Sequence, residues 1–526
     1  MRQLVIVSRA FLTMSRVCSV LLLLTLAVAC HAQRAPTLQR VANPASPDAL
    51  APSLTTGTDG VVWMSWIEPV AEGGHRLICA AFDSATQRWG DPREITRGAD
   101  WMINWADTPQ IAAGSGGRLA AVWFQLNEPG SDPHAAGYAA WLRLSTDGGV
   151  TWSTPARLSQ ESARNEFVSL VPLSNDRWLA VWLDGRHRSG HDGAMALYGR
   201  VVGDAGPDER LDPRVCDCCP TSIAQLPDGS VYVVYRDRGE EEVRDLAGRR
   251  WRDGVWTEAQ GLPQDGWKID GCPVNGPVLA RGAGSKLGLV WFSAAQGQPV
   301  VKSSLSTDFA VQWTMPHPLS RDIAPVGRVG AALHRDGTLW ATWLDTAGTL
   351  NLAAVAPSGD VLTAHRLSSG DPAGASRALG IPRLAAVNNA PGSAPAPLLI
   401  ARIEPGSDEA SGQLVTFLAS FPSSAPSAGG ATLADDCGCD RQTGTEGHPM
   451  RGRIVRLLPD QQAVLVAHEA IPGVMGAMTM AFKVDPRLLE FLKPGQEINA
   501  RMGRRNDGRW WMFNVRIAQR PPAGTP

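Results

Sequence analysis

The chain has 526 residues, of which 44% are hydrophobic, and a formal net charge of −2. This length is too great for one ordinary domain, and the hydrophobic content is sufficient for sizeable cores, so we expect two or more folded units. A charge so close to zero gives no electrostatic basis for binding nucleic acid, and we expect no such partner.

The N-terminus has the pattern of an export signal. Arginines precede an apolar run at residues 17–29 that is too short and wrongly flanked for a membrane span, so residues 1–30 are predicted to be a signal peptide. The end of the run, Leu-Ala-Val-Ala-Cys, resembles a bacterial lipoprotein box in which Cys30 becomes the lipidated first residue. Ordinary cleavage after Ala29 or Ala32 is the alternative. We therefore expect a periplasmic protein that is anchored to the outer membrane through that lipid alone.

Between residues 50 and 403 a hairpin pattern recurs, in which a short apolar strand, a turn and a second strand follow one another. Successive copies lie 52 to 59 residues apart, which is the length of one four-stranded propeller blade with somewhat long loops. Seven copies predict a seven-bladed β-propeller over residues 37–421, with six blades as the alternative if the seventh copy merges with the first. The copies end at Trp66, Trp123, Trp182, Tyr235, Trp291, Trp343 and, in a weaker form, Arg402.

The last predicted blade lacks its outer strand. After the seventh hairpin comes one further apolar strand, at residues 414–420, before the composition changes. Antiparallel sheets need their edges covered, and closure of a ring of blades covers them. We therefore predict that residues 37–41 supply the missing strand and close the ring.

Two segments fit a turn motif. Residues 145–152 fit the pattern S-x-D-x-G-x-T-W, and residues 306–313 are a degraded copy that lacks the glycine. In this pattern the Asp and Ser side chains satisfy turn amides while the Trp packs between sheets. On these residues the main body resembles the sialidase-like propellers with Asp-box, or BNR, repeats.

The resemblance implies a fold and says almost nothing about catalysis. Sialidases need an arginine triad, an Asp acid/base and a Tyr/Glu nucleophile pair, and the Arg-Ile-Pro element that usually carries the first arginine is absent from the sequence. The chain has four tyrosines, of which Tyr232 and Tyr235 lie within a predicted strand. We favour a protein without enzymatic activity, and keep a glycan-binding or exo-sialidase-like glycoside hydrolase as an alternative.

Charged residues follow the predicted strand ends of two neighbouring blades, where propeller loops reach a shared binding face. Alternating charge is also typical of a solvated loop with weak ion pairs, so the second interpretation is a structural network, and both interpretations stay open. The candidate residues for a ligand face are Arg186 in one blade and Arg236, Asp237, Arg238, Arg244 and Asp245 in the next.

Two groups of cysteines precede the first strands of neighbouring blades. Cys219 and Cys272 lie 53 residues apart, about one blade step, so we expect both groups to meet at the mouth of the propeller. A disulfide between two blades is one interpretation for an exported protein. The other is a thiolate cluster for Cu(I), or less readily zinc, which as a catalytic site would make the protein a copper-dependent oxidoreductase. The candidates are Cys216, Cys218, Cys219 and Cys272.

Residues 422–449 are rich in Pro, Ser, Ala and Gly and are predicted to be a flexible linker without a core. The linker contains Cys437 and Cys439, which resemble an exchangeable, metal-capturing pair. We hypothesise that this pair passes metal to the domain that follows.

One imidazole and three thioethers lie within thirteen residues near the C-terminus, at the spacing His468-x6-Met475-x2-Met478-x-Met480. Strand side chains alternate between faces, so Met478 and Met480 point to the same side. Thioethers are soft, uncharged donors that suit Cu(I), whereas hard cations prefer oxygen. The pattern therefore predicts a Cu(I) site, with methionines that merely fill a small core as the alternative.

The same region carries a family resemblance. Residues 450–518, with His468 and the triplet Met478-Thr479-Met480, resemble the CusF family of periplasmic Cu(I)/Ag(I)-binding proteins. The resemblance implies a small five-stranded OB-like barrel that binds Cu(I), with Ag(I) as a surrogate. Family members place a tryptophan over the ion, whereas this chain has Met475 near that position and a loop one residue shorter. A fourth sulfur ligand is the corresponding expectation for this chain.

Together these patterns predict an all-β, exported copper-binding protein in which a propeller is tethered to a CusF-like domain at residues 450–520. The expected role is periplasmic copper handling or resistance, and the expected partners are the copper ion and copper efflux or chaperone proteins. Trp510 and Trp511 on the last predicted strand either cover the ion or, as we favour, pack in the core.

Overall fold

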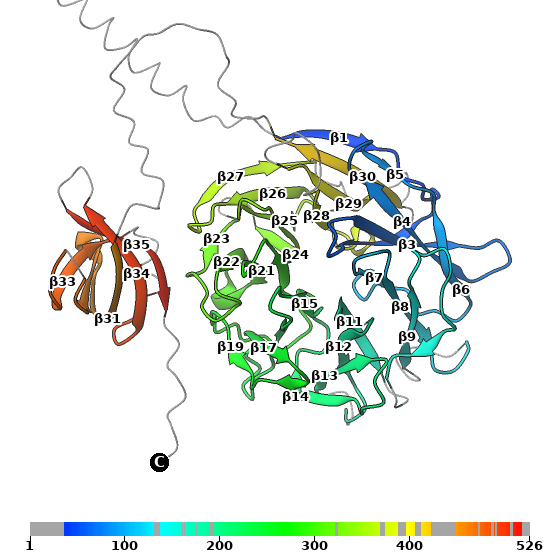
Figure 1. Ribbon diagram of the computed structural model, residues 1–526, viewed down its shortest axis with the longest axis horizontal. Helices are drawn as coiled ribbons and strands as arrows, with labels where there is room; N and C mark the ends of the chain where they lie inside the picture. The colour runs from blue at the N-terminus through cyan, green and yellow to red at the C-terminus, as the bar shows by residue number, and fades with distance from the viewer. Residues whose placement is uncertain are drawn as a thin grey trace, which may run out of the picture.

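The computed structural model shows a ring of seven β-sheets and, after it in the chain, a closed five-stranded barrel (Figure 1). This confirms the predicted all-β architecture, and the propeller has seven blades rather than six. Within the residues that the structure describes, no helix has the length and apolar character that a membrane crossing requires. The structure describes residues 36–421 and 448–517, apart from 131–136, 160, 162–163, 175, 189–192, 321–323, 369–373, 388–395, 406–411, 472–473, 485–488, 490–491 and 505–508.

Each blade is an antiparallel sheet whose first strand faces the centre of the ring, and the seven first strands together line a central cavity of about 310 Å³. Blade 1 consists of β2 (Leu50–Thr56), β3 (Val62–Pro69), β4 (His75–Asp83), β5 (Arg88–Trp89) and β6 (Arg93–Gly98), and blade 2 of β7 (Gln110–Ala113), β8 (Leu119–Leu126), β9 (Tyr138–Ser145) and β10 (Ala156–Arg157). Blade 3 consists of β11 (Asn165–Pro172), β12 (Trp178–Asp184), β13 (Met195–Val202) and β14 (Glu209–Val215).

The second half of the ring repeats this order. Blade 4 consists of β15 (Ser222–Gln225), β16 (Val231–Arg236), β17 (Leu246–Arg252), β18 (Val255–Trp256) and β19 (Gln260–Gly261), and blade 5 of β20 (Val278–Arg281), β21 (Leu287–Ser293), β22 (Val300–Ser306) and β23 (His317–Pro318). Blade 6 consists of β24 (Pro325–Leu333), β25 (Leu339–Asp345), β26 (Leu350–Val355) and β27 (Val361–Arg366). Short 3-10 helices occupy Ala295–Gly297 (η1) and Arg377–Leu379 (η2).

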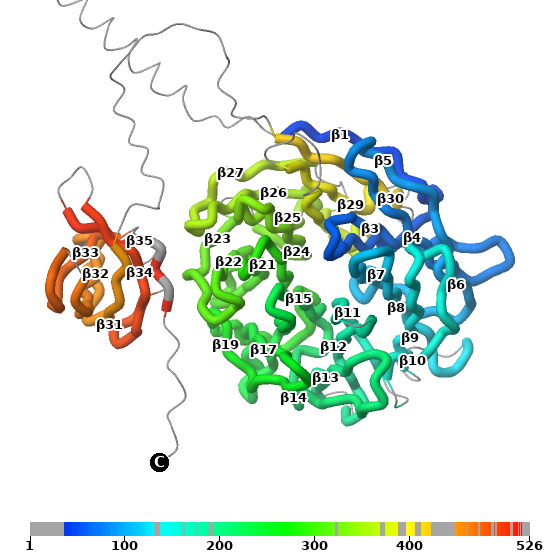
Figure 2. Tube along the Cα trace, in the orientation of Figure 1, coloured from blue at the N-terminus to red at the C-terminus, as the bar shows by residue number. Residues whose placement is uncertain are grey.

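Blade 7 joins the two ends of the propeller. It consists of β28 (Arg383–Ala386), β29 (Leu398–Pro405), β30 (Gly412–Ser420) and, as its outer strand, β1 (Thr37–Val41). β1 pairs antiparallel with β30, from Thr37 opposite Ser420 to Val41 opposite Thr416, and Figure 2 shows the blue first strand beside the yellow last one. The prediction that residues 37–41 close the ring is therefore confirmed.

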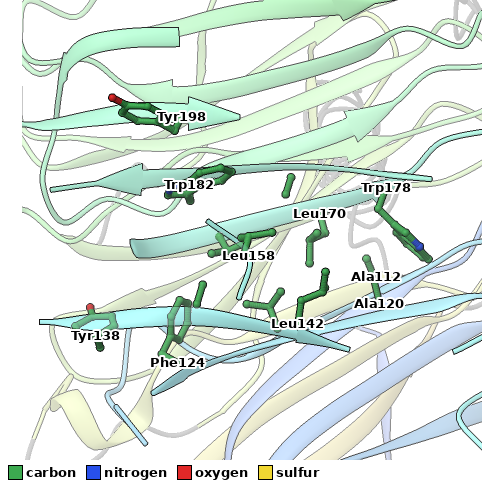
Figure 3. Packing of buried hydrophobic residues seen from close by; sticks show 14 of the residues in the cluster. Ala112, Ala120, Phe124, Tyr138, Leu142, Leu158, Leu170, Trp178, Trp182 and Tyr198 are labelled. Atoms are coloured by element: carbon green, nitrogen blue, oxygen red, sulfur yellow. The ribbon is translucent and has the colours of Figure 1, made fainter. Parts of the chain in front are cut away.

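Aromatic and aliphatic side chains fill the space between neighbouring blades. Figure 3 shows one such interface, in which Phe124 and Tyr138 of blade 2 and Trp182 and Tyr198 of blade 3 belong to a single buried cluster. The rings of Trp182 and Tyr198 stack at a centroid distance of 6.2 Å. Burial of these large aromatic surfaces between sheets stabilises the contact between adjacent blades.

Both Asp-box turns adopt the expected geometry. In the first, the backbone N–H of Gly149 donates to Ser145 Oγ at 2.9 Å, and in the degraded copy the N–H of Ala310 donates to Ser306 Oγ at 3.0 Å. The positions of the two glycines of the first turn are taken by Phe309 and Ala310 in the second, with φ values of 61° and 63°. The degraded copy therefore holds two residues with side chains in the left-handed region that favours glycine.

Two pairs of neighbouring blades are each joined by the same hydrogen-bonded clamp, which the sequence did not reveal. β11 and β24 each have a register shift near their start, at which Phe167 and Arg328 have φ values of 52° and 53°. The freed N–H of Phe167 donates to Asp107 Oδ1 at 2.9 Å, and that of Arg328 to Asn275 Oδ1 at 2.7 Å. Asp107 and Asn275 each lie three residues before the first strand of the preceding blade, so the same contact ties two pairs of blades.

The barrel is closed in the strand order β31-β32-β33-β35-β34. A single buried cluster fills it, including Val464, Val466 and Phe482. Its elements are β31 (His448–Leu458), η3 (Pro459–Gln461), β32 (Ala463–His468), β33 (Met478–Lys483), β34 (Glu497–Arg504) and β35 (Trp510–Ile517).

Candidate functional site

The barrel brings His468 and two of the predicted methionine ligands onto one face. β32 and β33 pair antiparallel, with His468 directly opposite Met478 and Val466 opposite Met480. Directly opposed residues lie on the same face of a sheet, so His468, Met478 and Met480 lie together. Val466 is fully buried on this face, whereas Met478 at the end of β33 is 51% exposed. The three side chains therefore line the rim of the barrel, where its interior meets solvent.

The imidazole of His468 is oriented to bind a metal through one nitrogen. Its Nδ1 lies 2.8 Å from the backbone oxygen of Glu469, and because a carbonyl oxygen only accepts, Nδ1 carries the hydrogen. In a neutral imidazole the other nitrogen, Nε2, then holds the free lone pair. Nε2 is buried and has no hydrogen-bond partner within the described part of the chain. Histidines that bind metals share this arrangement, in which a backbone carbonyl fixes one ring nitrogen and the other faces the ion.

The fourth predicted ligand, Met475, lies in the hairpin between β32 and β33. Ile471 and Met475 exchange backbone hydrogen bonds of 2.8 and 3.1 Å, which hold these two residues side by side. Met475 is partly buried and packs against the barrel core, as Met480 does. Met475, which lies three residues before Met478, is therefore held beside Ile471, which lies three residues after β32 ends.

Three other methionines of the barrel behave as core residues. Met450, Met502 and Met512 are at most 3% exposed and belong to the buried cluster of the barrel. Core filling, the alternative interpretation of the His/Met spacing, thus describes these three. It does not describe Met478, whose side chain fills no core.

Trp511 does not cover the His/Met rim. It pairs with Lys483, at the far end of β33 from Met478 and about 17 Å away along the strand. Trp510 packs partly buried against the barrel core, and the guanidinium of Arg504 stacks on its ring at 5.0 Å. Of the two expectations for these tryptophans, core packing is the one that the structure shows for Trp510.

The propeller brings its cysteines together. The Sγ atoms of Cys216, Cys218 and Cys219, in the loop between β14 and β15, all lie within 4.8 Å of one another, and those of Cys216 and Cys219 are 3.2 Å apart. Cys272, in the loop between β19 and β20 of the next blade, lies beside Cys218, whose thiol interacts with it. All four are free thiols, as is Cys79 in blade 1.

The thiols of this cluster differ in acidity. Hydrogen bonds from the Cys218 and Cys219 thiols lower the pKa of Cys216 well below its usual range, and the positive charge of Arg236 acts in the same direction. The pKa of Cys218 is raised because its thiol donates to Cys216, and the pKa of Cys219 is raised chiefly by burial. Cys216 is therefore the most acidic thiol of this loop, and the thiols beside it donate to its sulfur.

Most of the charged residues predicted for a ligand face contact other protein groups. Arg236 is 2% exposed and donates to the backbone oxygens of Asn275 at 3.0 Å and Phe292 at 2.8 Å, both in blade 5. Asp245 accepts hydrogen bonds from the backbone N–H groups of Asp265, Gly266 and Trp267.

The remaining members of this set are similar. Arg186 pairs with Asp184 and Asp208 at 2.7 and 2.8 Å, and Arg238 pairs with Asp217 at 3.2 Å. Arg244 donates to Cys216, and Asp237 accepts from the N–H of Arg238 at 2.8 Å. These contacts correspond to the second interpretation of the charged residues, a network that ties loops and blades together.

One acidic group was not expected from the sequence. Tyr138 donates to Asp107 at 3.2 Å, and burial raises the pKa of Asp107 well above its usual range. Burial also raises the pKa of neighbouring Glu166 to about 7. No motif marked these residues, because Tyr138 and Glu166 lie on different strands, β9 and β11, and Asp107 lies in the loop before β7. The matching position of Asn275 in blade 5 shows that the clamp formed by Asp107 does not need a charge.

Three predicted residues lie outside the part of the chain that the structure describes. These are Cys30 at the end of the export signal and the linker pair Cys437 and Cys439. Their proposed roles in lipid attachment and metal transfer stay predictions.

Residues 447–513 match the model of a family described as copper binding periplasmic protein CusF. The C-terminal barrel is a CusF-like domain. The match begins one residue before β31 and ends within β35, so it includes all four candidate ligands of the CusF-like barrel. It covers none of the propeller.

Solved structures with a similar propeller include the leech intramolecular trans-sialidase, with 11% identity over 72% of this chain and 68% of that chain and a TM-score of 0.40. A second is the BP39L lectin from Burkholderia pseudomallei, with 12% identity, coverage of 70% and 98%, and a TM-score of 0.45. A third is a PL25 ulvan lyase, with 12% identity, coverage of 74% and 95%, and a TM-score of 0.44. Likeness of this degree carries no argument about what the propeller binds. Among curated proteins, none matches the chain.

Proposed function

We propose that the protein is an exported copper-binding protein whose CusF-like barrel holds one Cu(I) through His468, Met475, Met478 and Met480. The observation that carries the proposal is the buried Nε2 of His468, which has no hydrogen-bond partner in the described residues and lies on the face it shares with Met478. The family match of residues 447–513 supports it. Copper is cargo here, and the protein acts in periplasmic copper handling or resistance without chemistry at the metal.

The donor set fits Cu(I) in softness and in charge. Thioethers and a neutral imidazole are soft or intermediate donors, and none of them loses a proton when the ion binds. Zinc in structural sites is held by thiolates and imidazoles, and hard cations by oxygens. Thioethers also form no disulfides, so the site survives in an oxidising compartment, although strong oxidants convert methionine to the sulfoxide.

An anaerobic titration of the full-length protein with Cu(I), against a competing chelator, tests the barrel site. We expect the Met478→Ala/Met480→Ala double variant to bind one equivalent less than the wild type, because two of the four ligands are gone. The matched control is Met502→Leu, a volume-conserving change at a fully buried core methionine, which should leave the stoichiometry unchanged. Full copper stoichiometry in the double variant would show that the barrel is not the site.

The proposed location is the periplasm, with a lipid on Cys30 as the anchor and copper efflux or chaperone proteins as donors or acceptors of the ion. The matched family is described as periplasmic, which supports this compartment. Metabolic labelling with palmitate tests the anchor: the wild type should incorporate the label and the Cys30→Ser variant should not. An unlabelled wild type in the periplasmic fraction would indicate ordinary cleavage instead.

A further inference from the structure

Close contact between two blades holds the four propeller cysteines together. Gly276, four residues after Cys272, packs against the backbone of Pro220, which directly follows Cys219. A Cβ added at Gly276 would lie 2.1 Å from the Pro220 oxygen, so this approach is possible only for glycine. The two cysteine-bearing segments are therefore fixed backbone against backbone. Their proximity is built into the contact between blades 4 and 5.

The surroundings of the cluster stabilise a negatively charged sulfur. Arg244 is 3% exposed, and its Nη1 lies 3.3 Å from the Sγ of the fully buried Cys216. Arg236, 2% exposed, adds a second buried positive charge nearby. Burying a guanidinium is costly unless an anion faces it. Glu242 pairs with Arg244 through Nη2, and Nη1 of the same guanidinium points at the Cys216 sulfur. This arrangement suits a metal-bound thiolate at Cys216 better than the uncharged sulfur of a disulfide.

The cluster is enclosed on one side and open on the other. Cys216 and Cys219 are at most 1% exposed, Cys218 is half-buried and Cys272 is exposed. Structural zinc sites are closed and four-coordinate. A group of three clustered thiols with a fourth at the surface is better suited to an ion that needs few ligands and is exchanged with a partner.

We propose that Cys216, Cys218 and Cys219 form a second Cu(I) site at the mouth of the propeller, with Cys272 as the surface thiol through which the ion enters and leaves. The three Sγ atoms are already grouped within 4.8 Å, and thiolates are ligands that Cu(I) favours. Each thiol that binds the ion releases its proton to solvent. The resulting copper–thiolate group is anionic, and the charges of Arg244 and Arg236 offset it. The site shares no residue with the barrel.

Full-length protein without the barrel ligands isolates this site. We expect the Met478→Ala/Met480→Ala variant to retain one tightly bound Cu(I) with thiolate-to-copper charge-transfer absorption in the ultraviolet. Adding Cys216→Ser/Cys219→Ser should remove both the ion and the absorption. In the converse protein, with the serine changes alone, the barrel should keep its copper without the absorption. The two sites can therefore fail independently of each other.

Because Cys216 and Cys219 are buried, near-ultraviolet circular dichroism checks that their variants fold. A second variant, Cys218→Ser/Cys272→Ser, changes the two more accessible thiols and should lower the affinity of the propeller site at least ten-fold. The matched control is Cys79→Ala in blade 1, a buried thiol whose pKa burial raises to about 12. This control should leave the copper content and the absorption unchanged.

Two results would overturn the second site. One is zinc in place of copper at the propeller of protein purified from copper-supplemented cells. The other is a disulfide among the four cysteines in exported protein whose thiols are trapped by alkylation at lysis.

Discussion

The two groups of soft donors differ in how the chain assembles them. The barrel takes His468, Met475, Met478 and Met480 from one hairpin, so the register of two paired strands places the donors. The propeller takes Cys216, Cys218 and Cys219 from one loop and Cys272 from the next blade, and a backbone contact at Gly276 holds the two segments together. Donors that are close in sequence can be recognised from their spacing, whereas the approach of Cys272 to the other three thiols depends on the repeat of blades and on how neighbouring blades pack.

The two groups also differ in charge. The barrel offers an imidazole and thioethers, which bind an ion as uncharged donors, at a rim where Met478 is half exposed. The propeller offers thiols, which bind an ion as thiolates, beside the buried Arg244. We therefore expect Cu(I) to bind uncharged donors in the barrel and thiolates in the propeller. Reagents that react with thiols alone should affect only the propeller site.

The largest difference is expected under mild oxidation. Diamide should abolish copper binding at the propeller, because the Sγ atoms of Cys216 and Cys219 lie 3.2 Å apart and need only a small movement to form a disulfide. The barrel should keep its equivalent, since thioethers cannot form disulfides. Copper titration before and after treatment, and again after reduction by dithiothreitol, measures the effect. Loss of both equivalents would remove the distinction between the sites.

Within the barrel, core and rim methionines should respond in opposite ways. Met512→Ala removes a side chain that is 1% exposed and should lower the free energy of unfolding by about 3 kcal/mol, with copper stoichiometry retained in the folded protein. Met478→Ala should change stability by less than about 0.5 kcal/mol while copper affinity falls. Hydrogen exchange of barrel peptides, followed by mass spectrometry, measures the first quantity. Equal destabilisation by both changes would mean that Met478 is a core residue after all.

A third change acts on the strand that holds His468 in place. An added Cβ at Gly452 would lie 2.7 Å from the Ala467 oxygen and 3.0 Å from His468 Cα. Gly452→Ala should therefore push β31 and β32 apart, at a cost of about 2 kcal/mol, and lower copper affinity roughly ten-fold.

The matched control for this change is Gly476→Ala, because a Cβ at Gly476 would meet no atom within 4 Å. Chelator competition with Cu(I) gives the affinities of both variants. An unchanged affinity in Gly452→Ala would show that the position of His468 tolerates movement of its strand.

The smallest effect concerns the propeller away from either site. Ala310 sits in the degraded Asp-box turn with a φ of 63°, where the intact turn has Gly149 with a φ of 82°. Ala310→Gly should raise the free energy of unfolding of the propeller by up to about 1 kcal/mol, because glycine adopts this conformation without strain. Ala353→Gly in strand β26 is the control and should lower it. Denaturant titration gives both values, and copper stoichiometry should not change in either variant.

Much of the architecture could be predicted because it repeats. The spacing of hairpins that end at residues such as Trp182 and Trp291 indicated seven blades, and the missing outer strand indicated that residues 37–41 close the ring. The pairing of His468 with Met478 also follows from a short loop and the alternation of strand side chains. These features depend on contacts that are close in sequence or copied from blade to blade.

The contacts that could not be predicted depend on the packing of separate loops. Charge alternation around Arg236 did not reveal that its guanidinium would bind backbone oxygens of the next blade. The role of Asp107 depends on a freed N–H at Phe167, sixty residues later. The sequence placed Trp511 on the last strand without showing beside which end of β33 it would lie. The order of strands in the barrel places it beside Lys483, at the opposite end of β33 from Met478.

The seam of blade 7 has a mechanical consequence. Thr37 is paired with Ser420, so the two chain segments that leave the propeller start from the same end of one strand pair. With the lipid anchor proposed at Cys30, tension between that anchor and the barrel would act on this end. It would separate β1 from β30 one hydrogen bond at a time, before it reached the other six blades. The blades that carry the cysteines would then bear no load until β1 had separated from β30.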